Sequence, residues 1–281
     1  MTRIAGATFS FGDLTLEQSA SLLAGLGFAF ADVGAGWSNY QQVSPRAAAD
    51  DPDREAARLR RVMEANGLAV SELFLMQFED PINHPDVAAR RATSIIFDQV
   101  TTFAAKAGFE SVMMIPGQVH EDLGQEPREA FDTSAEALRS MVGVAQDKGL
   151  ACNIEPCMGS VAHEPTAAIA LCEAVPGLGL TLDYAHQVQL DLDHEQIEPM
   201  HRYARHMHAK PSAPGTFQVP ADESVIDFPR IVRKLEADRY DGVFCVEYVT
   251  SQAVLDAGWD VIEETAKLKG ILEDALRREK G

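Results

Sequence analysis

The sequence predicts an α/β protein in which eight strand–helix units close into a (β/α)8 TIM barrel. The first observation is that short apolar runs alternate with longer amphipathic segments throughout the 281 residues. Strict alternation favours parallel strands joined by right-handed crossovers, and eight such units are the number that closes a barrel. Periodicity alone does not distinguish a barrel from an open doubly wound sheet, which stays as the alternative. Because no linker separates the units, we expect a single domain over residues 1–281.

Each predicted strand is a short apolar run before a turn signal, and each predicted helix has a recognisable start or stop. We expect strands at 4–8, 28–33, 68–75, 110–115, 150–155, 178–183, 204–210 and 242–248. We expect helices at 16–26, 54–66, 85–107, 127–148, 165–175, 194–203, 228–237 and 251–279. Thr15 is a typical N-cap for the first helix, the pair Asn66-Gly67 ends the second, and Gly108 ends the third.

The composition argues against several classes of protein. The net charge is −19, and such a charge repels a phosphate backbone, so we expect no nucleic-acid partner. No run of about 18 apolar residues occurs, so we expect no membrane-spanning helix and no membrane partner. The first residues lack the order of a signal peptide, which favours a cytoplasmic location. The four cysteines include no CxxC pair, which argues against a zinc ribbon.

Four predicted strands end on a side chain that can bind a metal. Glu155 ends the fifth strand, Asp183 ends the sixth, and His208 and Glu247 lie near the ends of the seventh and eighth. The carboxyl ends of parallel strands meet at one face of a barrel, so we expect these four side chains to converge. Three carboxylates crowded into one pocket repel one another, and a divalent cation removes that repulsion.

The donor types indicate the kind of metal. Three carboxylates and one imidazole, with no thiolate, suit a hard or borderline ion that accepts octahedral geometry. We therefore predict one divalent metal ion, with Mn²⁺ preferred and Mg²⁺, Co²⁺ and Zn²⁺ as alternatives. Each side chain alone could be a solvated carboxylate or a hydrogen-bonded histidine. Their corresponding positions in successive units favour a metal site.

Further side chains near the strand ends are candidates for the pocket. Lys210 shares the side-chain parity of His208, so its ammonium either binds a substrate oxyanion or pairs with a carboxylate. His206 has the same parity but lies deeper, as expected of a core histidine with a partner. Glu72, His84 and His120 are weaker candidates, for which solvent exposure or a structural hydrogen bond is the better interpretation. An aromatic wall for the pocket could be formed by Phe11, Trp37 and Phe74, although aromatic residues near strand ends more often belong to the core.

An ordered set of short motifs surrounds these side chains. The motifs are Asn153-Ile154-Glu155-Pro156, Leu182-Asp183-Tyr184-Ala185-His186, His208-Ala209-Lys210, Val246-Glu247, Met114-Ile115-Pro116-Gly117 and Val225-Ile226-Asp227-Phe228. The set resembles the xylose isomerase-like TIM-barrel superfamily over nearly the whole chain. The resemblance is strongest to its sugar (phosphate) isomerase/epimerase branch.

The resemblance implies an isomerase or epimerase that shifts a proton α to a carbonyl through a metal-stabilised enediolate. It implies that Glu155 and Glu247 are the catalytic acid/base pair as well as metal ligands, and that Asp183 and His208 only hold the metal. His186 follows Asp183 by three residues and is implied to hydrogen-bond a substrate oxygen. The expected partner is a small carbohydrate, and assembly into a homo-oligomer stays open.

The sequence departs from the family pattern after the seventh strand. Ketose epimerases of the family carry an arginine there, whereas residues 211–224 contain neither Arg nor Lys. A dehydratase or other lyase that uses the same enolate is therefore the main alternative. A site like that of endonuclease IV, with three zinc ions, is rejected because Ile115 stands in place of a required histidine and residues 211–228 contain none. A barrel that binds a sugar or metal without turnover is the remaining alternative.

Overall fold

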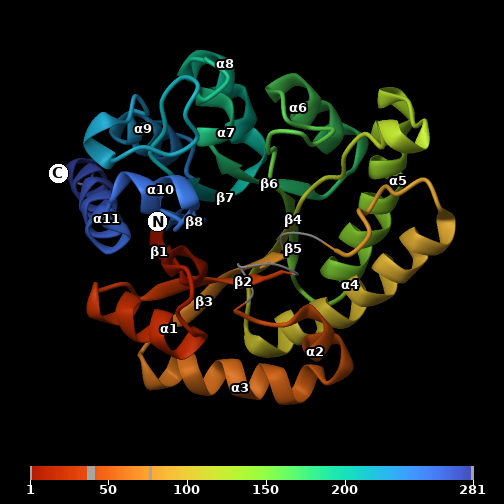
Figure 1. The fold of residues 1–281 in the computed structure, drawn as a ribbon, viewed down its shortest axis with the longest axis horizontal. Coiled ribbons are helices and arrows are strands. Elements are labelled where there is room, and N and C mark those ends of the chain that lie inside the picture. The colour runs from red at the N-terminus through yellow and green to blue at the C-terminus, as the bar shows by residue number, and fades with distance from the viewer. Residues whose placement is uncertain (1, 37–41, 76–77, 280–281) are drawn as a thin grey trace.

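The computed structural model describes residues 2–36, 42–75 and 78–279, and its strands form a closed parallel barrel (Figure 1). Neighbouring strands pair in chain order, and β1 closes the ring by pairing with β8, where Arg3 lies opposite Val243. The strands are β1 (Arg3–Ala7), β2 (Phe30–Ala35), β3 (Ala69–Leu75), β4 (Ser111–Met114), β5 (Ala151–Ile154), β6 (Leu178–Asp183), β7 (Ala204–Ala209) and β8 (Val243–Val246). The predicted (β/α)8 barrel is confirmed, and the open sheet is wrong.

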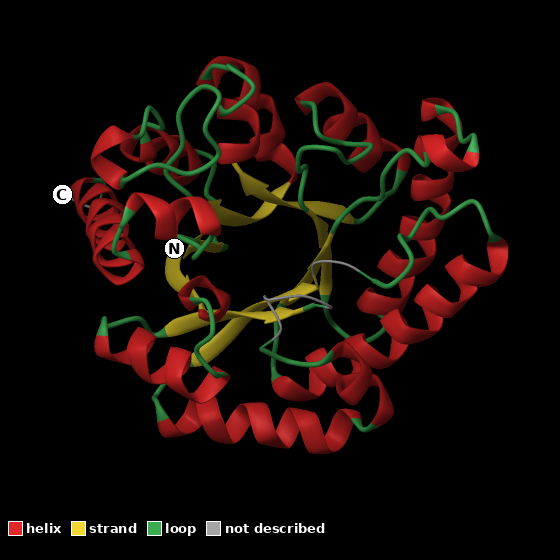
Figure 2. Ribbon diagram, in the orientation of Figure 1, coloured by secondary structure: helices red, strands yellow, loops and turns green. Residues whose placement is uncertain are grey.

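The helices form an outer layer around the strands (Figure 2). The α-helices are α1 (Leu16–Gly25), α2 (Pro45–Asp50), α3 (Pro52–Ala65), α4 (Val87–Ala107), α5 (Pro127–Gln146), α6 (Pro165–Ala174), α7 (Ala185–Val188), α8 (His194–Ile197), α9 (Phe228–Ala237), α10 (Gln252–Ala257) and α11 (Val261–Arg278). The 3₁₀ helices are η1 (Thr8–Phe11), η2 (Glu121–Leu123), η3 (Glu198–Tyr203) and η4 (Ala221–Glu223). Within the described residues, no helix is both long enough and apolar enough to span a membrane.

The helix signals identified in the sequence have the expected geometry. Thr15 caps α1 in a capping box, in which its side chain accepts the Gln18 amide and the Gln18 side chain accepts the Thr15 amide. Gly108 ends α4 with a φ of 95°, a left-handed conformation that favours glycine. In addition, Asp51 caps α3, where its side chain accepts a hydrogen bond from the Arg54 amide.

Three predicted boundaries are corrected. No helix was expected between the predicted strand 28–33 and the predicted helix 54–66, but α2 begins there at Pro45 and is capped by Ser44. The predicted helix 194–203 is α8 followed by η3, because Pro199 has no amide hydrogen with which to continue an α-helix. The predicted helical region 251–279 divides into α10 and α11 at Gly258, where a φ of 70° ends the first helix.

The apolar core has a large outer part and a small inner part. The outer part lies between the strands and the helices, and includes Leu59, Phe97 and Leu138. The inner cluster consists of Ala5, Ala7, Phe9, Phe74, Met113, Val243, Cys245 and Val249, which come from η1, four strands and the loop after β8. The rest of the barrel interior includes buried polar residues, and the predicted ligands lie above these.

Candidate functional site

All four predicted metal ligands lie at the carboxyl ends of the strands and are buried. Asp183 is the last residue of β6 and His208 lies in β7, while Glu155 and Glu247 directly follow β5 and β8. Their exposed fractions are between 1% and 4%. The four side chains therefore share one buried region at the mouth of the barrel, on adjacent strands.

His208 joins the two glutamates. Its Nδ1 atom lies 3.1 Å from Glu155 Oε1 and 2.9 Å from Glu247 Oε2. One ligand atom from each of these three residues lies within 4.8 Å of the other two. Bonds of about 2.0–2.2 Å place opposing donors about 4.2 Å apart, so one ion can reach all three side chains.

Asp183 lies to one side of this group. It forms a second group with Glu155 and His186, again with ligand atoms within 4.8 Å of one another. The Lys210 ammonium lies between Asp183 and Glu247, 3.2 Å from Asp183 Oδ2 and 3.1 Å from Glu247 Oε1. Of the two roles expected for Lys210, pairing with carboxylates is the one that its contacts show.

The two glutamates are poised to be ionised. Burial alone raises the pKa of Glu155, but His186 and His208 outweigh burial and hold this pKa well below its usual range. Burial also raises the pKa of Glu247, and Lys210 and His208 lower it by more. Both carboxylates can therefore accept a proton or bind a cation at neutral pH.

Positive side chains balance this charge. Burial lowers the pKa of His208, but Glu247, Asp32 and Glu155 raise it well above its ordinary value. Burial likewise lowers the pKa of Lys210, and the nearby carboxylates, Glu247 first, raise it by more. A divalent ion bound at His208 Nδ1 has to replace the proton there, because the metal takes a neutral imidazole.

The available donors fit a divalent cation. Within the described residues, Asp183 Oδ2 and Glu247 Oε2 are buried oxygens that accept no hydrogen bond, although Lys210 and His208 lie at ion-pair distance. Buried polar atoms nearly always have a hydrogen-bond partner. Two such oxygens beside an imidazole are the donors expected for the divalent ion predicted from the sequence.

Aromatic rings border the group. The Phe74 ring lies 5.6 Å from the His208 ring and stacks on Phe9 at 4.6 Å. On the other side, Phe217 lies 4.6 Å from the His186 ring, and the Lys210 ammonium lies 4.3 Å from the Phe217 ring centre. Of the predicted aromatic wall, Phe74 borders the group, Phe11 packs in the outer core and Trp37 lies outside the described residues.

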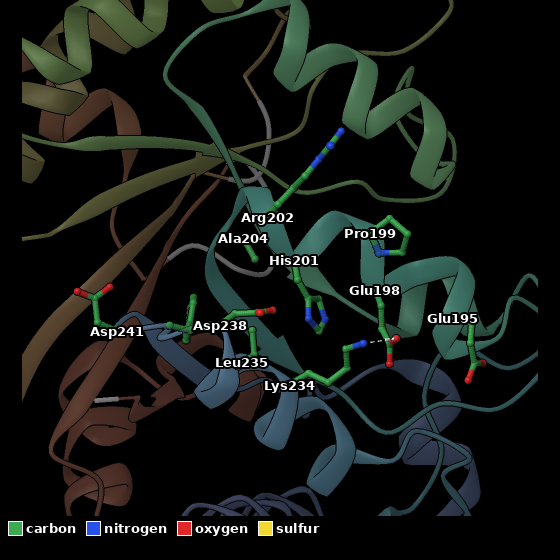
Figure 3. Close-up of a pocket in the computed structure, with 11 residues that line it drawn as sticks. Glu195, Glu198, Pro199, His201, Arg202, Ala204, Lys234, Leu235, Asp238 and Asp241 are labelled. Atoms are coloured by element: carbon green, nitrogen blue, oxygen red, sulfur yellow. Dashed lines mark hydrogen bonds and ion pairs between the residues drawn. The ribbon is translucent and has the colours of Figure 1, made fainter.

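Two hollows lie at the opposite end of the barrel. One has a volume of about 710 Å³ and lies between η3 and the end of α9, where His201 and Lys234 are among its lining residues (Figure 3). The other has a volume of about 440 Å³, lies below the amino ends of the strands and is bordered by Arg3 and His206. The described residues that line either hollow do not include a predicted metal ligand.

Comparison with known sequences identifies the family. The sequence model of the xylose isomerase-like TIM-barrel family matches residues 21–271. The chain belongs to this family. A search of curated proteins found no match.

Solved structures share the fold of this xylose isomerase-like barrel. A D-tagatose 3-epimerase-like protein has 19% identity, a TM-score of 0.77 and coverage of 99% of each chain. An L-ribulose 3-epimerase has 18% identity and a TM-score of 0.75, with 100% of this chain and 97% of that chain covered. A 3-keto-D-glucoside 4-epimerase from E. coli has 12% identity and a TM-score of 0.72, with 96% and 100% covered. At such identities, the similarity shows the fold alone.

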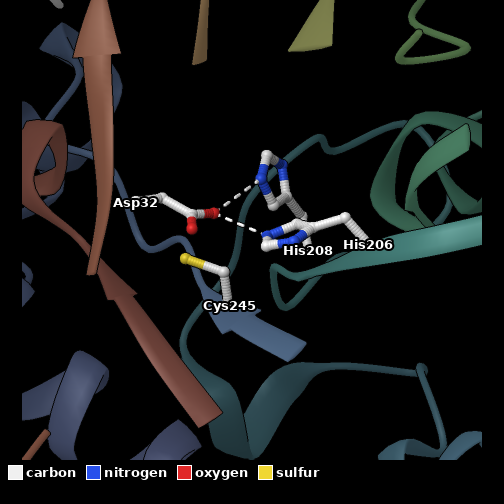
Figure 4. A group of neighbouring side chains, drawn as sticks. All are labelled: Asp32, His206, His208 and Cys245. Carbon is white, nitrogen blue, oxygen red and sulfur yellow. Dashed lines mark hydrogen bonds and ion pairs between the residues drawn. The ribbon is translucent and has the colours of Figure 1, made fainter. Parts of the chain in front are cut away.

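Sequence reasoning missed one side chain of this xylose isomerase-like site. Asp32 of β2 is fully buried, and its Oδ2 atom lies 2.7 Å from His206 Nε2 and 3.4 Å from His208 Nε2 (Figure 4). The available signal was a carboxylate in the middle of the apolar run 28–33. His206 has the partner that was expected for a core histidine.

The weaker polar candidates lie elsewhere. Glu72 is fully buried and accepts hydrogen bonds from Ser111, Asn153 and Thr181 at 2.6–2.7 Å. The His84 and His120 rings lie 5.3 Å apart and pack against each other in the loops after β3 and β4. These contacts agree with the structural roles that the sequence favoured.

Proposed function

We propose that the protein is a divalent-metal-dependent carbohydrate epimerase or isomerase that moves a proton α to a carbonyl. The observation that carries this proposal is the pair of buried carboxylates, Glu155 and Glu247, which both face His208 Nδ1, at 3.1 and 2.9 Å. Family membership and the epimerase structures that share the fold support the same class of reaction.

The residues that would hold the ion are Glu155, Asp183, His208 and Glu247. Bound there, a divalent ion supplies a Lewis acid that polarises the carbonyl and stabilises the enediolate. Mn²⁺ is the ion that we propose, because carboxylate oxygens dominate the donor set and a single imidazole completes it. His208 would offer the Nδ1 atom that faces Glu247, and Asp183 would offer the oxygen that faces Lys210.

Glu155 and Glu247 would share the proton chemistry. A carboxylate with a low pKa is a weak base, so it can take the α proton only when the substrate carbonyl is strongly polarised. We assign proton abstraction to one glutamate. An epimer results when the other glutamate returns a proton to the opposite face of the same carbon, and an isomer results when one glutamate moves the proton between neighbouring carbons.

His186 and Lys210 would bind substrate oxygens. The His186 ring packs on Phe217, and its Nε2 atom lies 3.7 Å from Glu155 Oε2, so it borders the acid/base pair. The Lys210 ammonium lies between Asp183 and Glu247 and above the Phe217 ring. Both are donors that can hold hydroxyl or carbonyl oxygens of a sugar.

The surrounding charges favour an uncharged carbohydrate over a sugar phosphate. By sequence, Lys210 is the only Lys or Arg in the eight segments that join a strand's carboxyl end to the next α-helix. Helix N-termini can also bind phosphate. The side chains of Asp86 and Asp227 already accept amide hydrogens in the first turns of α4 and α9. The N-termini of α5 and α6 have no side-chain cap, but the residues at those positions are Glu126 and Glu164. A phosphate at this face would therefore meet mostly carboxylates.

We further propose that the protein works as one domain in the cytoplasm. The family match over residues 21–271 supports a single domain. The cysteines Cys152, Cys157, Cys172 and Cys245 are all free thiols. Free thiols are typical of a reducing compartment.

The test incubates the Mn²⁺-loaded protein in deuterated water with free ketoses, ketose phosphates, inososes and 3-keto sugars. It measures the incorporation of deuterium into each substrate. Exchange at the carbon α to the carbonyl, with formation of an epimer or isomer, is the expected result. Release of water with a conjugated enone would instead indicate the dehydratase alternative, which the described contacts do not favour.

A pair of variants tests the assignment of the base. Glu155→Gln should abolish exchange, whereas Glu164→Gln should leave it unchanged, because Glu164 is an exposed carboxylate in the same loop. No exchange with any carbonyl substrate would refute the enediolate mechanism, and full activity of Glu155→Gln would refute the role of Glu155.

A further inference from the structure

A layer of polar side chains lies directly below the predicted metal ligands. Side chains two positions apart on a strand point to the same side. The residues two positions before Glu155, Asp183, His208 and Glu247 all have polar or sulfur-containing side chains. They are Asn153, Thr181, His206 and Cys245, and all four are buried. The ligands therefore rest on a second inward-facing layer that belongs to the same strands.

Asp32 links this lower layer to His208. Its Oδ2 atom accepts a hydrogen bond from His206 Nε2 at 2.7 Å and faces His208 Nε2 at 3.4 Å (Figure 4). Its Oδ1 atom accepts hydrogen bonds from the Ser71 hydroxyl and from the Glu72 amide, the latter at 3.1 Å. Three donors, from Ser71, Glu72 and His206, therefore hold the carboxylate beside His208 Nε2.

We propose that Asp32 is a positioning residue that sets the orientation and tautomer of His208 for metal binding, an inference that rests on the proposed metal site. The two nitrogens of His208 face different partners. The Nε2 atom faces Asp32, and the Nδ1 atom faces Glu155 and Glu247. An ionised carboxylate only accepts hydrogen bonds, so it favours a proton on Nε2. The Nδ1 lone pair is then directed at the metal.

His206 completes the arrangement from below. Its ring lies 5.5 Å from the His208 ring at an interplanar angle of 89°, and its Nε2 atom is also 4.0 Å from Glu72 Oε1. The His206 ring therefore holds Asp32 in place by a hydrogen bond, while the His208 ring faces the negative charge of Asp32. Burying an ionised carboxylate without hydrogen-bond donors costs much free energy. The hydrogen bond from His206 offsets part of that cost for Asp32.

A second metal ion in the lower layer is the competing interpretation. Asp32, His206, His208 and Cys245 each offer a ligand atom within 4.8 Å of the others. However, both Asp32 oxygens already accept hydrogen bonds, and the 2.7 Å separation from His206 is a hydrogen-bond distance. The carboxylate is satisfied by the protein itself, which favours positioning over ligation.

The experiment uses the full chain labelled with ¹⁵N-histidine and titrated with Zn²⁺ alone, as a diamagnetic probe. The chain has eight histidines, so two-bond ¹H–¹⁵N spectra can resolve each ring, and a His208→Asn variant assigns the His208 signals. The wild-type protein should bind one equivalent of Zn²⁺, with His208 protonated at Nε2 and coordinated through Nδ1. Coordination through His208 Nε2, or binding of a second equivalent of Zn²⁺ by Cys245, would overturn the proposal. This result needs only the wild-type protein and no Asp32 variant.

Two matched variants then test Asp32 itself. Asp32→Asn should weaken Zn²⁺ binding by about 10–100-fold, the usual effect of removing a carboxylate that orients a metal-binding histidine. It should also change the His208 tautomer. Glu72→Gln removes a neighbouring buried carboxylate whose side-chain hydrogen bonds do not involve His208, and should change Zn²⁺ affinity by less than about threefold.

The outcomes separate this inference from the proposed function. Equal effects of the two variants on Zn²⁺ affinity, or an unchanged His208 spectrum in Asp32→Asn, would refute positioning by Asp32. If the wild-type protein binds Zn²⁺ as described but turns over no carbonyl substrate, the proposed reaction fails and the role of Asp32 stands. If neither variant folds, the wild-type spectrum still tests the proposal, because it shows which His208 nitrogen carries the proton and which binds Zn²⁺.

Discussion

Replacing Lys210 with methionine tests whether its ammonium serves as the cation of the site before a metal binds. The ammonium is 3% exposed and lies 3.2 Å from Asp183 Oδ2 and 3.1 Å from Glu247 Oε1. Methionine keeps most of the apolar length of the side chain and removes the ammonium group with its charge and its N–H donors. The variant therefore leaves two buried carboxylates facing each other without their shared partner.

The expected loss of stability follows from these distances. At an effective dielectric constant of about 20, each ion pair at this separation has a Coulomb energy of about 5 kcal/mol. Most of that energy is offset by the desolvation of the buried ammonium. Breaking a buried ion pair by removing one partner typically costs about 3–5 kcal/mol, and we expect a loss in this range for Lys210→Met in EDTA.

Urea unfolding in EDTA and in saturating Mn²⁺ measures the effect. A bound Mn²⁺ ion replaces the missing charge and no longer competes with the ammonium, so Lys210→Met should bind Mn²⁺ more tightly and regain most of its stability. Lys234→Met is the matched control, because Lys234 forms a surface ion pair with Glu198, worth about 0–1 kcal/mol. Equal destabilisation of Lys210→Met with and without Mn²⁺ would refute the reasoning.

Three further predictions concern single residues. Glu247→Gln should lower kcat by at least about 100-fold, the usual contribution of a general acid or base, in the deuterium-exchange assay. Burial lowers the pKa of His201 from 6.5 to about 4, so stability that is complete above pH 6.5 should fall by about 3 kcal/mol as the pH drops to 4. His201→Gln should remove that part of the pH dependence of urea unfolding, and an unchanged slope would contradict it. Gly117 has a φ of 96°, and a Cβ atom there would lie 2.6 Å from side-chain atoms of Asn83, so Gly117→Ala should lower the thermal midpoint by the equivalent of about 1–3 kcal/mol. Gly143→Ala, in open space on α5, should instead raise it.

Most of the fold could be predicted because each unit carries local signals. Periodicity located the eight strands, and caps such as Thr15 and Gly108 located helix ends. Closure was predicted only from the number of units, because the pairing of β1 with β8 joins residues from opposite ends of the chain and leaves no local signal. The helix α2 was missed because it is only 6 residues long, too short for an apolar period to repeat.

The ligands could be predicted because the end of a parallel strand fixes where a side chain lies. Asp183 and Glu247 follow from that rule without any knowledge of side-chain packing. Asp32 could not be predicted in the same way, since it lies in the middle of β2, and its role depends on the ring of His208 from the other side of the barrel. The pairing of Lys210 with two carboxylates likewise depends on distances that no spacing in the sequence encodes.

The barrel interior is divided into an apolar part and a polar part, and the division explains where the candidate site lies. Phe9, Phe74 and Met113 belong to the inner apolar cluster, whereas Asp32 and Glu72 belong to the polar layer. A TIM barrel usually fills this layer with branched apolar side chains. Buried carboxylates replace them here and are stabilised only because each accepts several hydrogen bonds. A sugar bound at the mouth would therefore have hydroxyl groups over the ligands and carbon-bound hydrogens over Phe74, which fixes its orientation by polarity on one side and by ring contact on the other.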